Sequence, residues 1–263
     1  MDLGIRGRVA LVGASGRGLG RATAERLAME GCNVAICDKD ESVLDESLES
    51  VKAAGQDIQA AAYPVDLTKN EEIESLVASV KRDLGPVSIL VTNSGGPPPG
   101  AFDAADDEKW LFAYQLTFHS ATRLIRTVLP DMKAQKWGRI INFTSRSLKE
   151  PIPNLIISNA VRLAVGGMAK TLAAEVAEHG ITVNNVCPGP TTTDRAIELA
   201  AARGEKKGLT VEEELAQTIK SIPMGRLAKP EEQAAAVAYL ASELAGYITG
   251  ISLLVDGGAV KAL

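Results

Sequence analysis

The chain is poor in the side chains that usually carry metal or nucleophile chemistry. Of its 263 residues only two are histidines, His119 and His179, and they lie far apart in the sequence. We therefore predict neither a metal site nor a histidine-activated nucleophile. The three cysteines, Cys32, Cys37 and Cys187, have no Cys-x-x-Cys spacing and lie in apolar surroundings. This pattern favours reduced core cysteines over a disulfide or a metal site.

The sequence also lacks an excess of basic charge and a long apolar run. The net charge is −5 and the basic residues are dispersed, which gives no electrostatic basis for binding nucleic acid or an anionic membrane surface. No apolar run approaches the roughly 20 residues that span a bilayer. The first residues, "MDLGIRGRVALV", do not show the pattern of a secretory signal. We expect a cytoplasmic protein whose partner is a small molecule.

Short β-rich runs alternate with longer helical segments along the whole chain. Apolar spacing predicts helices at about 18–30, 41–54, 70–83, 106–135 and 157–179. Strands are predicted at 8–13, 33–38, 57–66, 87–93, 138–145, 181–189 and 251–258. Strands separated by helices imply a parallel sheet, and their nearly continuous apolar character indicates helices on both faces. We predict the α/β class: one Rossmann-fold domain over 1–263, with a doubly wound, seven-stranded parallel sheet.

One segment, at about 190–225, departs from this alternation. It is polar and helical in pattern, and it follows the carboxyl end of a strand, where α/β folds bind ligands. We interpret it as a lid over the substrate, with a plain surface insertion as the alternative. Within it, the acidic cluster 212–214 is most simply a solvated helix face.

A glycine-rich turn follows the first strand. The run "VGASGRGLGRATA" leads from that strand into a helix and contains Gly16, Gly18 and Gly20. Residues without bulk allow a pyrophosphate to approach the backbone, and the helix start offers unpaired N–H groups and a positive dipole end. Glycines alone fit any tight turn, but their place between strand and helix indicates a dinucleotide site.

Asp38 closes the second strand, about twenty residues beyond the turn. A carboxylate there accepts hydrogen bonds from the adenosine ribose hydroxyls and repels a 2′-phosphate, whereas a solvated acid is the plain alternative. Arg17 instead favours NADP, because a guanidinium in the turn can pair with a 2′-phosphate. Since Asp38 would repel that phosphate at close range, we predict NAD as cofactor, with NADP as the alternative.

Together these features resemble the short-chain dehydrogenase/reductase family, over essentially the whole chain, and especially its 3-oxoacyl-(acyl carrier protein) reductase-like members. The family's Thr-Gly-x-x-x-Gly-x-Gly turn corresponds to 13–20, with the last two glycines retained and the first Thr-Gly pair replaced by Gly-Ala. "DL" at 66–67, "TNSG" at 92–95, "PGPTTT" at 188–193 and the tail "GRLAKPEEQAAAVAYLASELAGYITGISLLVDGG" are similar to further family motifs. In relatives the tail region builds a tetramer interface, so the resemblance implies a homotetramer, or a homodimer.

The resemblance also implies a cofactor site. In the family, the turn holds the dinucleotide, the Asp-Leu pair flanks adenine, and the Pro-Gly-x-x-x-Thr segment meets the nicotinamide amide. The corresponding residues here are Gly13, Ser15, Gly16, Arg17, Gly18, Leu19, Asp38, Asp66, Leu67, Asn93, Ser94, Gly95, Arg162, Pro188, Gly189, Thr191 and Thr193.

The family's catalytic Asn, Ser, Tyr and Lys are matched less well. Ser145 takes the serine position; the tyrosine, thirteen residues later, becomes Ser158, and the lysine, four further on, becomes Arg162. The asparagine position, seven residues after Trp110, falls on Thr117. "GRIIN" before and "AVGGMAKTLAAEVAEHGITVN" after support this register. The resemblance thus implies a catalytic site of Ser145, Ser158, Arg162 and Thr117.

These replacements change the acid–base chemistry. A phenol has a pKa near 10, a serine hydroxyl is a far weaker acid, and arginine stays protonated. Arg162 can still bind ribose hydroxyls and place a positive charge beside an alkoxide, while Ser145 and Ser158 hold the substrate oxygen. The proton then comes from water or from Lys149. Tyr114 is a further phenol near Thr117, although a helix-packing role is the commoner one.

We predict an NAD(P)-dependent oxidoreductase that interconverts a ketone or β-ketoacyl-type carbonyl and its alcohol by hydride transfer, with a non-standard proton relay. The alternative is an inactive or regulatory NAD-binding homologue, because Tyr, Lys and Asn are all replaced. A different nicotinamide reaction, such as imine reduction or an elimination, also stays open. Basic residues around the predicted pocket, at 146, 149 and 195, suggest an anionic or carboxylate-bearing substrate, with ordinary surface charge as the alternative.

Overall fold

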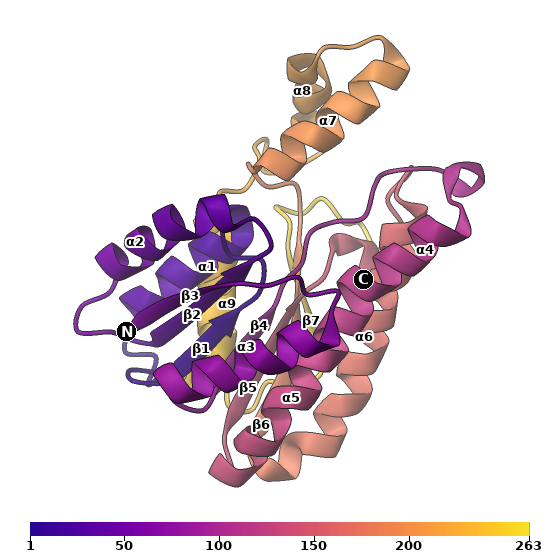
Figure 1. The fold of residues 1–263 in the computed structure, drawn as a ribbon. Helices are drawn as coiled ribbons and strands as arrows, with labels where there is room; N and C mark the ends of the chain where they lie inside the picture. The colour runs from indigo at the N-terminus through magenta and orange to yellow at the C-terminus, as the bar shows by residue number, and fades with distance from the viewer. Residues whose placement is uncertain (263) are drawn as a thin grey trace.

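A computed structural model describes residues 1–262 and contains a seven-stranded parallel sheet (Figure 1). The strands are β1 (Val9–Val12), β2 (Asn33–Asp38), β3 (Ala60–Pro64), β4 (Ile89–Thr92), β5 (Gly138–Phe143), β6 (Ile181–Pro188) and β7 (Ser252–Val255). They lie in the order β3-β2-β1-β4-β5-β6-β7. The order reverses between β1 and β4, and the crevice at such a reversal is where doubly wound sheets bind ligands. The predicted fold class is confirmed.

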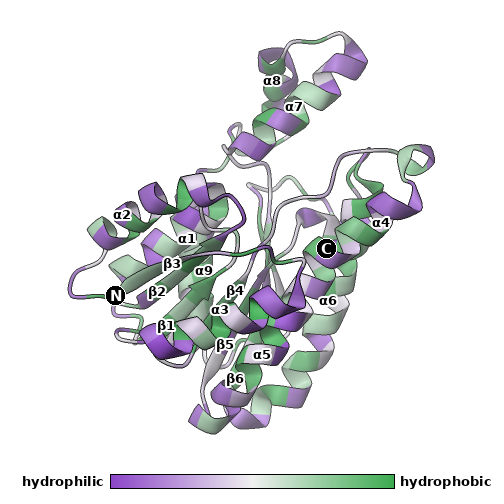
Figure 2. Ribbon diagram, viewed as in Figure 1, coloured by the Kyte–Doolittle hydropathy of each residue, from purple (hydrophilic) through white to green (hydrophobic). Residues whose placement is uncertain are grey.

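Helices cover both faces of the sheet. On one face lie α1 (Gly18–Met29), α2 (Leu44–Ala54) and α9 (Pro230–Ala241); on the other lie α3 (Asn70–Asp83), α5 (Ser120–Gln135) and α6 (Ile156–Val176). Successive strand residues alternate between the two cores, so Leu11 packs toward α3 and α5 while Val12 packs toward α1 and α9. Both cores are apolar, which explains the nearly continuous hydrophobic strands (Figure 2). No helix in 1–262 is long and apolar enough to cross a membrane.

The helix predicted over 106–135 is divided. It consists of α4 (Asp107–Ala113), a π-helical turn over Tyr114–His119, and α5. The helix predicted over 41–54 begins with a 3-10 turn at Glu41–Val43, because the Asp40 carboxylate accepts from the Ser42 N–H and caps it. π-Helical turns are rare and often lie at functional sites. The π-helical turn at Tyr114–His119 directly precedes α5, which packs against β4 and β5.

A helical hairpin projects beyond the carboxyl edge of the sheet (Figure 1). Its arms are α7 (Asp194–Lys207) and α8 (Val211–Lys220). The hairpin leaves and re-enters the domain through a narrow neck, where the Thr192 N–H donates to Ala228 O at 2.9 Å and the Ala228 N–H donates to Pro190 O at 3.0 Å. Both ends of the excursion therefore meet at one point beside β6.

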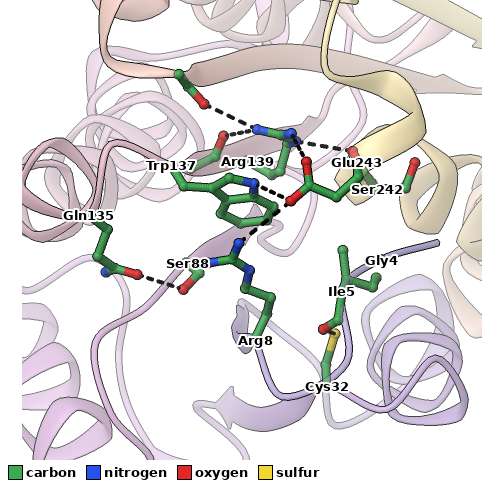
Figure 3. Close-up of polar contacts among 12 residues, drawn as sticks. Gly4, Ile5, Arg8, Cys32, Ser88, Gln135, Trp137, Arg139, Ser242 and Glu243 are labelled. Atoms are coloured by element: carbon green, nitrogen blue, oxygen red, sulfur yellow. Dashed lines mark hydrogen bonds and ion pairs between the residues drawn. The ribbon is translucent and has the colours of Figure 1, made fainter.

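A cation–π cluster stabilises the amino edge of the sheet (Figure 3). The Trp137 ring lies between the guanidinium carbons of Arg8 and Arg139, at 3.9 and 4.3 Å from its centroid. Its indole N–H donates to Glu243 Oε1 at 2.8 Å, and the same carboxylate pairs with both arginines at 3.5 and 3.6 Å. The buried Arg139 charge is thus compensated, at the edge of the sheet opposite the hairpin.

The three cysteines are buried and unbonded to one another. The Cys32 and Cys37 thiols point at backbone carbonyls, with Sγ 3.4 Å from Ile5 O and 3.7 Å from Val12 O. Burial raises the pKa of both thiols to about 12. The predicted reduced core cysteines agree with this arrangement.

The buried thiols predict a loss of stability at alkaline pH. An unfolded thiol ionises near pH 8.5, whereas these stay protonated to about pH 12, so the folded state binds more protons between the two values. The free energy of unfolding should fall by about 1.4 kcal/mol per pH unit for each thiol over that interval. Urea unfolding at several pH values above 8 measures this fall. The Cys32→Ala/Cys37→Ala variant should lose stability less steeply with pH; parallel curves for variant and wild type would contradict the prediction.

Candidate functional site

A cavity of about 980 Å³ lies at the carboxyl edge of the sheet. Its walls come from the glycine-rich turn, the ends of β4, β5 and β6, the start of α6, and the hairpin. Sixteen of the predicted site residues line it: Arg17, Gly18, Leu19, Asp38, Asp66, Leu67, Asn93, Ser94, Gly95, Ser145, Ser158, Arg162, Pro188, Gly189, Thr191 and Thr193. The structure therefore brings most of the predicted cofactor and catalytic positions to one space.

Three residues expected at the cofactor lie behind the cavity wall. The Ser15 side chain is fully buried; its hydroxyl donates to Val12 O at 2.8 Å and accepts from the Cys37 N–H at 3.0 Å. Gly13 and Gly16 have no room for a side chain, because a Cβ on Gly13 would lie 2.6 Å from Asn93 O and one on Gly16 would overlap Val43 Cγ2. These residues shape the turn rather than line the cavity.

Asp38 is fixed where β2 ends. Its Oδ2 accepts from the Gly16 N–H and its Oδ1 from the Asp40 N–H, both at 3.1 Å. The carboxylate thereby ties the glycine-rich turn to β2 and still lines the cavity. Arg17 is engaged elsewhere, since its Nη2 pairs with Asp40 Oδ2 at 3.1 Å. This end of the cavity combines a fixed carboxylate with an exposed ion pair.

The loop after β4 connects the turn to the hairpin. Asn93 Nδ2 donates to Ala14 O at 3.1 Å and holds the glycine-rich turn against β4. Further along the loop, Pro97 O accepts from Arg195 Nη2 at 2.7 Å. Arg195 belongs to the first turn of α7 and pairs through Nη1 with Glu198 Oε2 at 3.0 Å. One arginine thus links the loop and the hairpin across the cavity.

Ser145 follows β5 and caps a 3-10 turn over Arg146–Leu148. Its Oγ accepts from the Ser147 N–H at 3.0 Å. The hydroxyl of Ser158, on the first turn of α6, accepts from Arg162 Nε at 3.3 Å. No residue among 1–262 accepts the hydrogen of either hydroxyl. Both hydroxyls can therefore donate to a ligand oxygen in the cavity.

Arg162 is held against the end of β5. Its Nη1 donates to Thr144 O at 2.9 Å and to Phe143 O at 3.2 Å. Burial, and secondarily the positive charge of Arg195, lower the pKa of Arg162 to about 10, so the guanidinium remains charged at neutral pH. Its Nη2 has no acceptor in the described part of the chain. The free Nη2 of Arg162 and the hydroxyls of Ser145 and Ser158 together form a set of hydrogen-bond donors that suits a developing oxyanion.

Thr117 does not line the cavity. It lies in the π-helical turn, where its buried Oγ1 has no hydrogen-bond partner within 1–262, and its neighbour Leu116 reaches the cavity instead. The Tyr114 ring packs against His119 in a tilted arrangement, with ring centroids 4.4 Å apart and an interplanar angle of 45°, and it lines a separate hollow beside Trp110. Lys149 is exposed to solvent and does not line the cavity either.

The cavity wall contains lysines and carboxylates, but among the described residues no phenol, imidazole or thiol lines it. None of its lining residues, as far as the described chain extends, is a tyrosine, histidine or cysteine. The sequence suggested Lys149 as a proton donor and Tyr114 as a nearby phenol, and neither side chain lines the cavity. Neither of these two side chains is therefore at the cavity wall to donate a proton to a substrate oxygen.

The sequence did not reveal the charge network of the hairpin. Glu214, expected on a solvated helix face, is buried and binds Arg203 Nε at 3.1 Å and Lys207 Nζ at 2.8 Å. The spacing of Arg203 and Lys207, four residues apart on one face of α7, is a sequence signal from which a shared acidic partner could have been inferred. The two arms of the hairpin are joined by this network.

Comparisons with known proteins agree on one family. Residues 13–260 match the family model described as enoyl-(acyl carrier protein) reductase. The chain is 35% identical over 254 residues to a 3-oxoacyl-(acyl-carrier-protein) reductase of Haemophilus influenzae, covering 97% of this chain and 98% of the relative. It is 33% identical over 257 residues to the 2,3-dihydro-2,3-dihydroxybenzoate dehydrogenase of Bacillus subtilis, covering 97% of each chain.

The similarity extends to solved structures. The crystal structure of L-sorbose reductase from Gluconobacter frateurii, complexed with NADPH and L-sorbose, superposes with a TM-score of 0.94. It shares 34% sequence identity, and the match covers 100% of both chains. Sequence and structure thus match over nearly the full length.

Proposed function

Because this chain belongs to the short-chain dehydrogenase/reductase family, we propose that it is an NAD(P)-dependent oxidoreductase that interconverts a carbonyl compound and its alcohol. The observation that carries the proposal is the convergence of Ser145, Ser158 and Arg162 on the cavity that the glycine-rich turn also lines. In this proposal the dinucleotide binds where the glycine-rich turn lines the cavity. The substrate binds where Ser145, Ser158 and Arg162 line it, a region called here the substrate end.

The residues of the turn fit a dinucleotide. A Cβ on Gly20 would overlap Ala14 O, so the absence of side chains is what brings the turn onto the start of α1. Arg17, the N-cap residue of α1, makes no side-chain cap, which leaves the first N–H groups of the helix free for a pyrophosphate. Asp38 stands where the adenosine ribose of NAD would bind, and Asp66, Leu67, Pro188 and Thr193 would hold the two ends of the cofactor.

At the substrate end, the chain's own groups bind and polarise a carbonyl. When bound, the nicotinamide supplies the hydride in reduction and accepts it in oxidation. The Ser145 and Ser158 hydroxyls donate to the carbonyl oxygen, and the fixed Arg162 charge stabilises that oxygen as it becomes an alkoxide. The alkoxide is basic enough to take a proton from water in the cavity, so no tyrosine is required.

Initial rates of NADH oxidation test the proposal on a panel of ketones, β-ketoacyl thioesters and sugars. Turnover that falls by about 10² or more in Ser145→Ala would support the oxyanion assignment. Turnover that is unaffected by Ser145→Ala would refute it. The second candidate, a non-catalytic NAD-binding protein, is favoured by the lack of a tyrosine among the described residues that line the cavity. Calorimetric binding of NADH with no turnover on the panel would establish that candidate instead.

We further propose that residues 190–225 form the substrate lid, and that the chain forms a homotetramer or homodimer. The contribution of Arg195, Leu199 and Leu215 to the cavity wall supports the lid. The exposed apolar side chains of Leu111 and Phe112 on α4 and of Leu163 on the adjacent α6 support a subunit interface. Light scattering coupled to size-exclusion chromatography measures the oligomeric state.

Gly20→Ala should weaken NADH binding by about tenfold or more. The added methyl would overlap Ala14 O and lie 2.8 Å from Ser15 Cα, so the turn must open, at a cost of about 1–3 kcal/mol. Fluorescence titration of NADH measures the affinity. Gly167→Ala is the matched control, because that helical glycine has nothing within 4 Å and alanine favours the helix. Equal affinity in the two variants would contradict the prediction.

A further inference from the structure

The substrate end of the cavity holds positive charge that no carboxylate neutralises. Arg146 and Arg162 both line it, and neither forms an ion pair with any residue in 1–262. The acids nearby are committed: Glu198 pairs with Arg195, and Glu214 pairs with Arg203 and Lys207. Asp194, at the start of α7, also lines the cavity, but its side chain is exposed to solvent and forms no ion pair with residues 1–262, so one free carboxylate stands against two unpaired arginines. The region next to Ser145 is therefore cationic.

Arg146 is the cation best placed to bind a substrate. It directly follows Ser145, and the hydrogen bond from the Ser147 N–H to Ser145 Oγ fixes the backbone of all three residues. The Arg146 side chain is half-buried, lines the cavity and makes no hydrogen bond with the described residues. Its guanidinium keeps all five donors available beside the hydroxyl that binds the carbonyl.

The charges also select among substrates. Arg195 lies close enough to Arg162 for the two positive charges to repel each other, which contributes to the lowered pKa of Arg162. A cationic substrate such as an iminium would add to this repulsion, which argues against imine reduction. An anion would relieve it, and a planar carboxylate matches the guanidinium fork in a bidentate pair.

We propose that the substrate is a small oxo acid, whose carboxylate is bound by Arg146 while its carbonyl oxygen meets Ser145 and Ser158. This inference rests on the proposed function. In the reduction, the carbonyl carbon gains a hydride from NADH, the oxygen gains a proton from water, and NAD⁺ leaves. The carboxylate is unchanged and serves only to hold the substrate.

The test compares charged and neutral forms of one substrate. We measure kcat/KM for 2-, 3- and 4-oxo acids and for their methyl esters, with wild type, Arg146→Gln and Arg6→Gln. Arg6 is exposed and precedes β1 at the opposite edge of the sheet, so its variant carries the same charge change away from the cavity. A lost charge-assisted hydrogen bond predicts that the acid-to-ester ratio falls about 10- to 100-fold in Arg146→Gln, mainly through KM. The ratio should be unchanged in Arg6→Gln.

A binding measurement separates this inference from the proposed function. Succinate is titrated calorimetrically into the protein with and without NADH. If no oxo acid or ester turns over but Arg146→Gln alone loses succinate binding, the hydride-transfer proposal fails and the carboxylate site stands. Three results would each overturn the inference: kcat/KM values for the esters that equal those for the acids, an acid-to-ester ratio that Arg146→Gln does not change, or no binding of succinate. So would an Arg146-dependent preference for coenzyme A thioesters over free acids, because the arginine would then serve the carrier's phosphates.

Discussion

Arg162→Met is expected to lower kcat for carbonyl reduction by about 10²–10³. The variant keeps an unbranched side chain, shorter than that of arginine, and removes the positive charge that is proposed to stabilise the alkoxide. It also removes the donors to Phe143 O, Thr144 O and Ser158 Oγ, so Ser158 loses the bond that orients its hydroxyl. Steady-state kinetics with saturating NADH measure the effect, which should fall on kcat more than on the KM of the carbonyl substrate.

Arg162→Lys is the matched control for charge. The ammonium retains the charge but cannot bond Ser158 and the β5 carbonyls together, so partial recovery of kcat is expected. Because Arg162 has a pKa of about 10, its charge should produce no inflection in kcat between pH 6 and 9 and should be lost only above pH 10. Equal kcat in wild type and Arg162→Met, with both variants folded by urea titration, would refute the oxyanion role.

Asp38→Asn should change the coenzyme preference from NADH toward NADPH. The asparagine oxygen can still accept from the Gly16 N–H, so the turn is retained while the negative charge is removed. A unit charge about 4 Å from another contributes about 4 kcal/mol near a protein surface, so relief of repulsion toward a 2′-phosphate should raise the NADPH-to-NADH ratio of kcat/KM by about 10²-fold or more. Kinetics with each coenzyme at fixed carbonyl substrate measure the ratio.

Asp45→Asn provides the control, because this exposed residue on α2 carries the same charge away from the cavity wall. Its coenzyme ratio should equal that of wild type. A wild-type enzyme that already prefers NADPH would contradict the NAD prediction. In that case Arg17, now paired with Asp40, would be the residue that turns to the 2′-phosphate.

The family resemblance, applied through the spacing of three residues, predicted that Ser145, Ser158 and Arg162 would lie together, and all three line one cavity. Ser145 ends a strand, while Ser158 and Arg162 are four apart on the following helix, and this local geometry survives in any fold that keeps the strand and helix adjacent. The strand–helix alternation likewise determined the sheet, because parallel pairing leaves few topologies. The fold class and the meeting of these three residues at one cavity therefore followed from patterns within single elements, while their catalytic role stays a prediction.

The sequence did not predict the roles of residues that depend on contacts with distant parts of the chain. Ser15 is polar and lies in the cofactor motif, yet its hydroxyl turns between β1 and β2 and never reaches the cavity. Glu214 is buried because the opposite arm of the hairpin brings Arg203 to it. The π-helical turn at 114–119 was also missed, since one wide turn hardly alters an apolar period over thirty residues. Each depends on tertiary packing that no local window contains.

The neck of the hairpin makes one wall of the cavity a separable module, which is the property that the proposed substrate lid requires. Residues 190–192 and Ala228 meet side by side, so a segment of another length can join the same two points with little added loop entropy. Insertions, deletions or wholesale exchange between relatives can then alter the roof over the cavity. The sheet, the glycine-rich turn and the two serines would keep their places. Evolution, or an engineer, can therefore graft a new hairpin here and retain the chemistry beneath it.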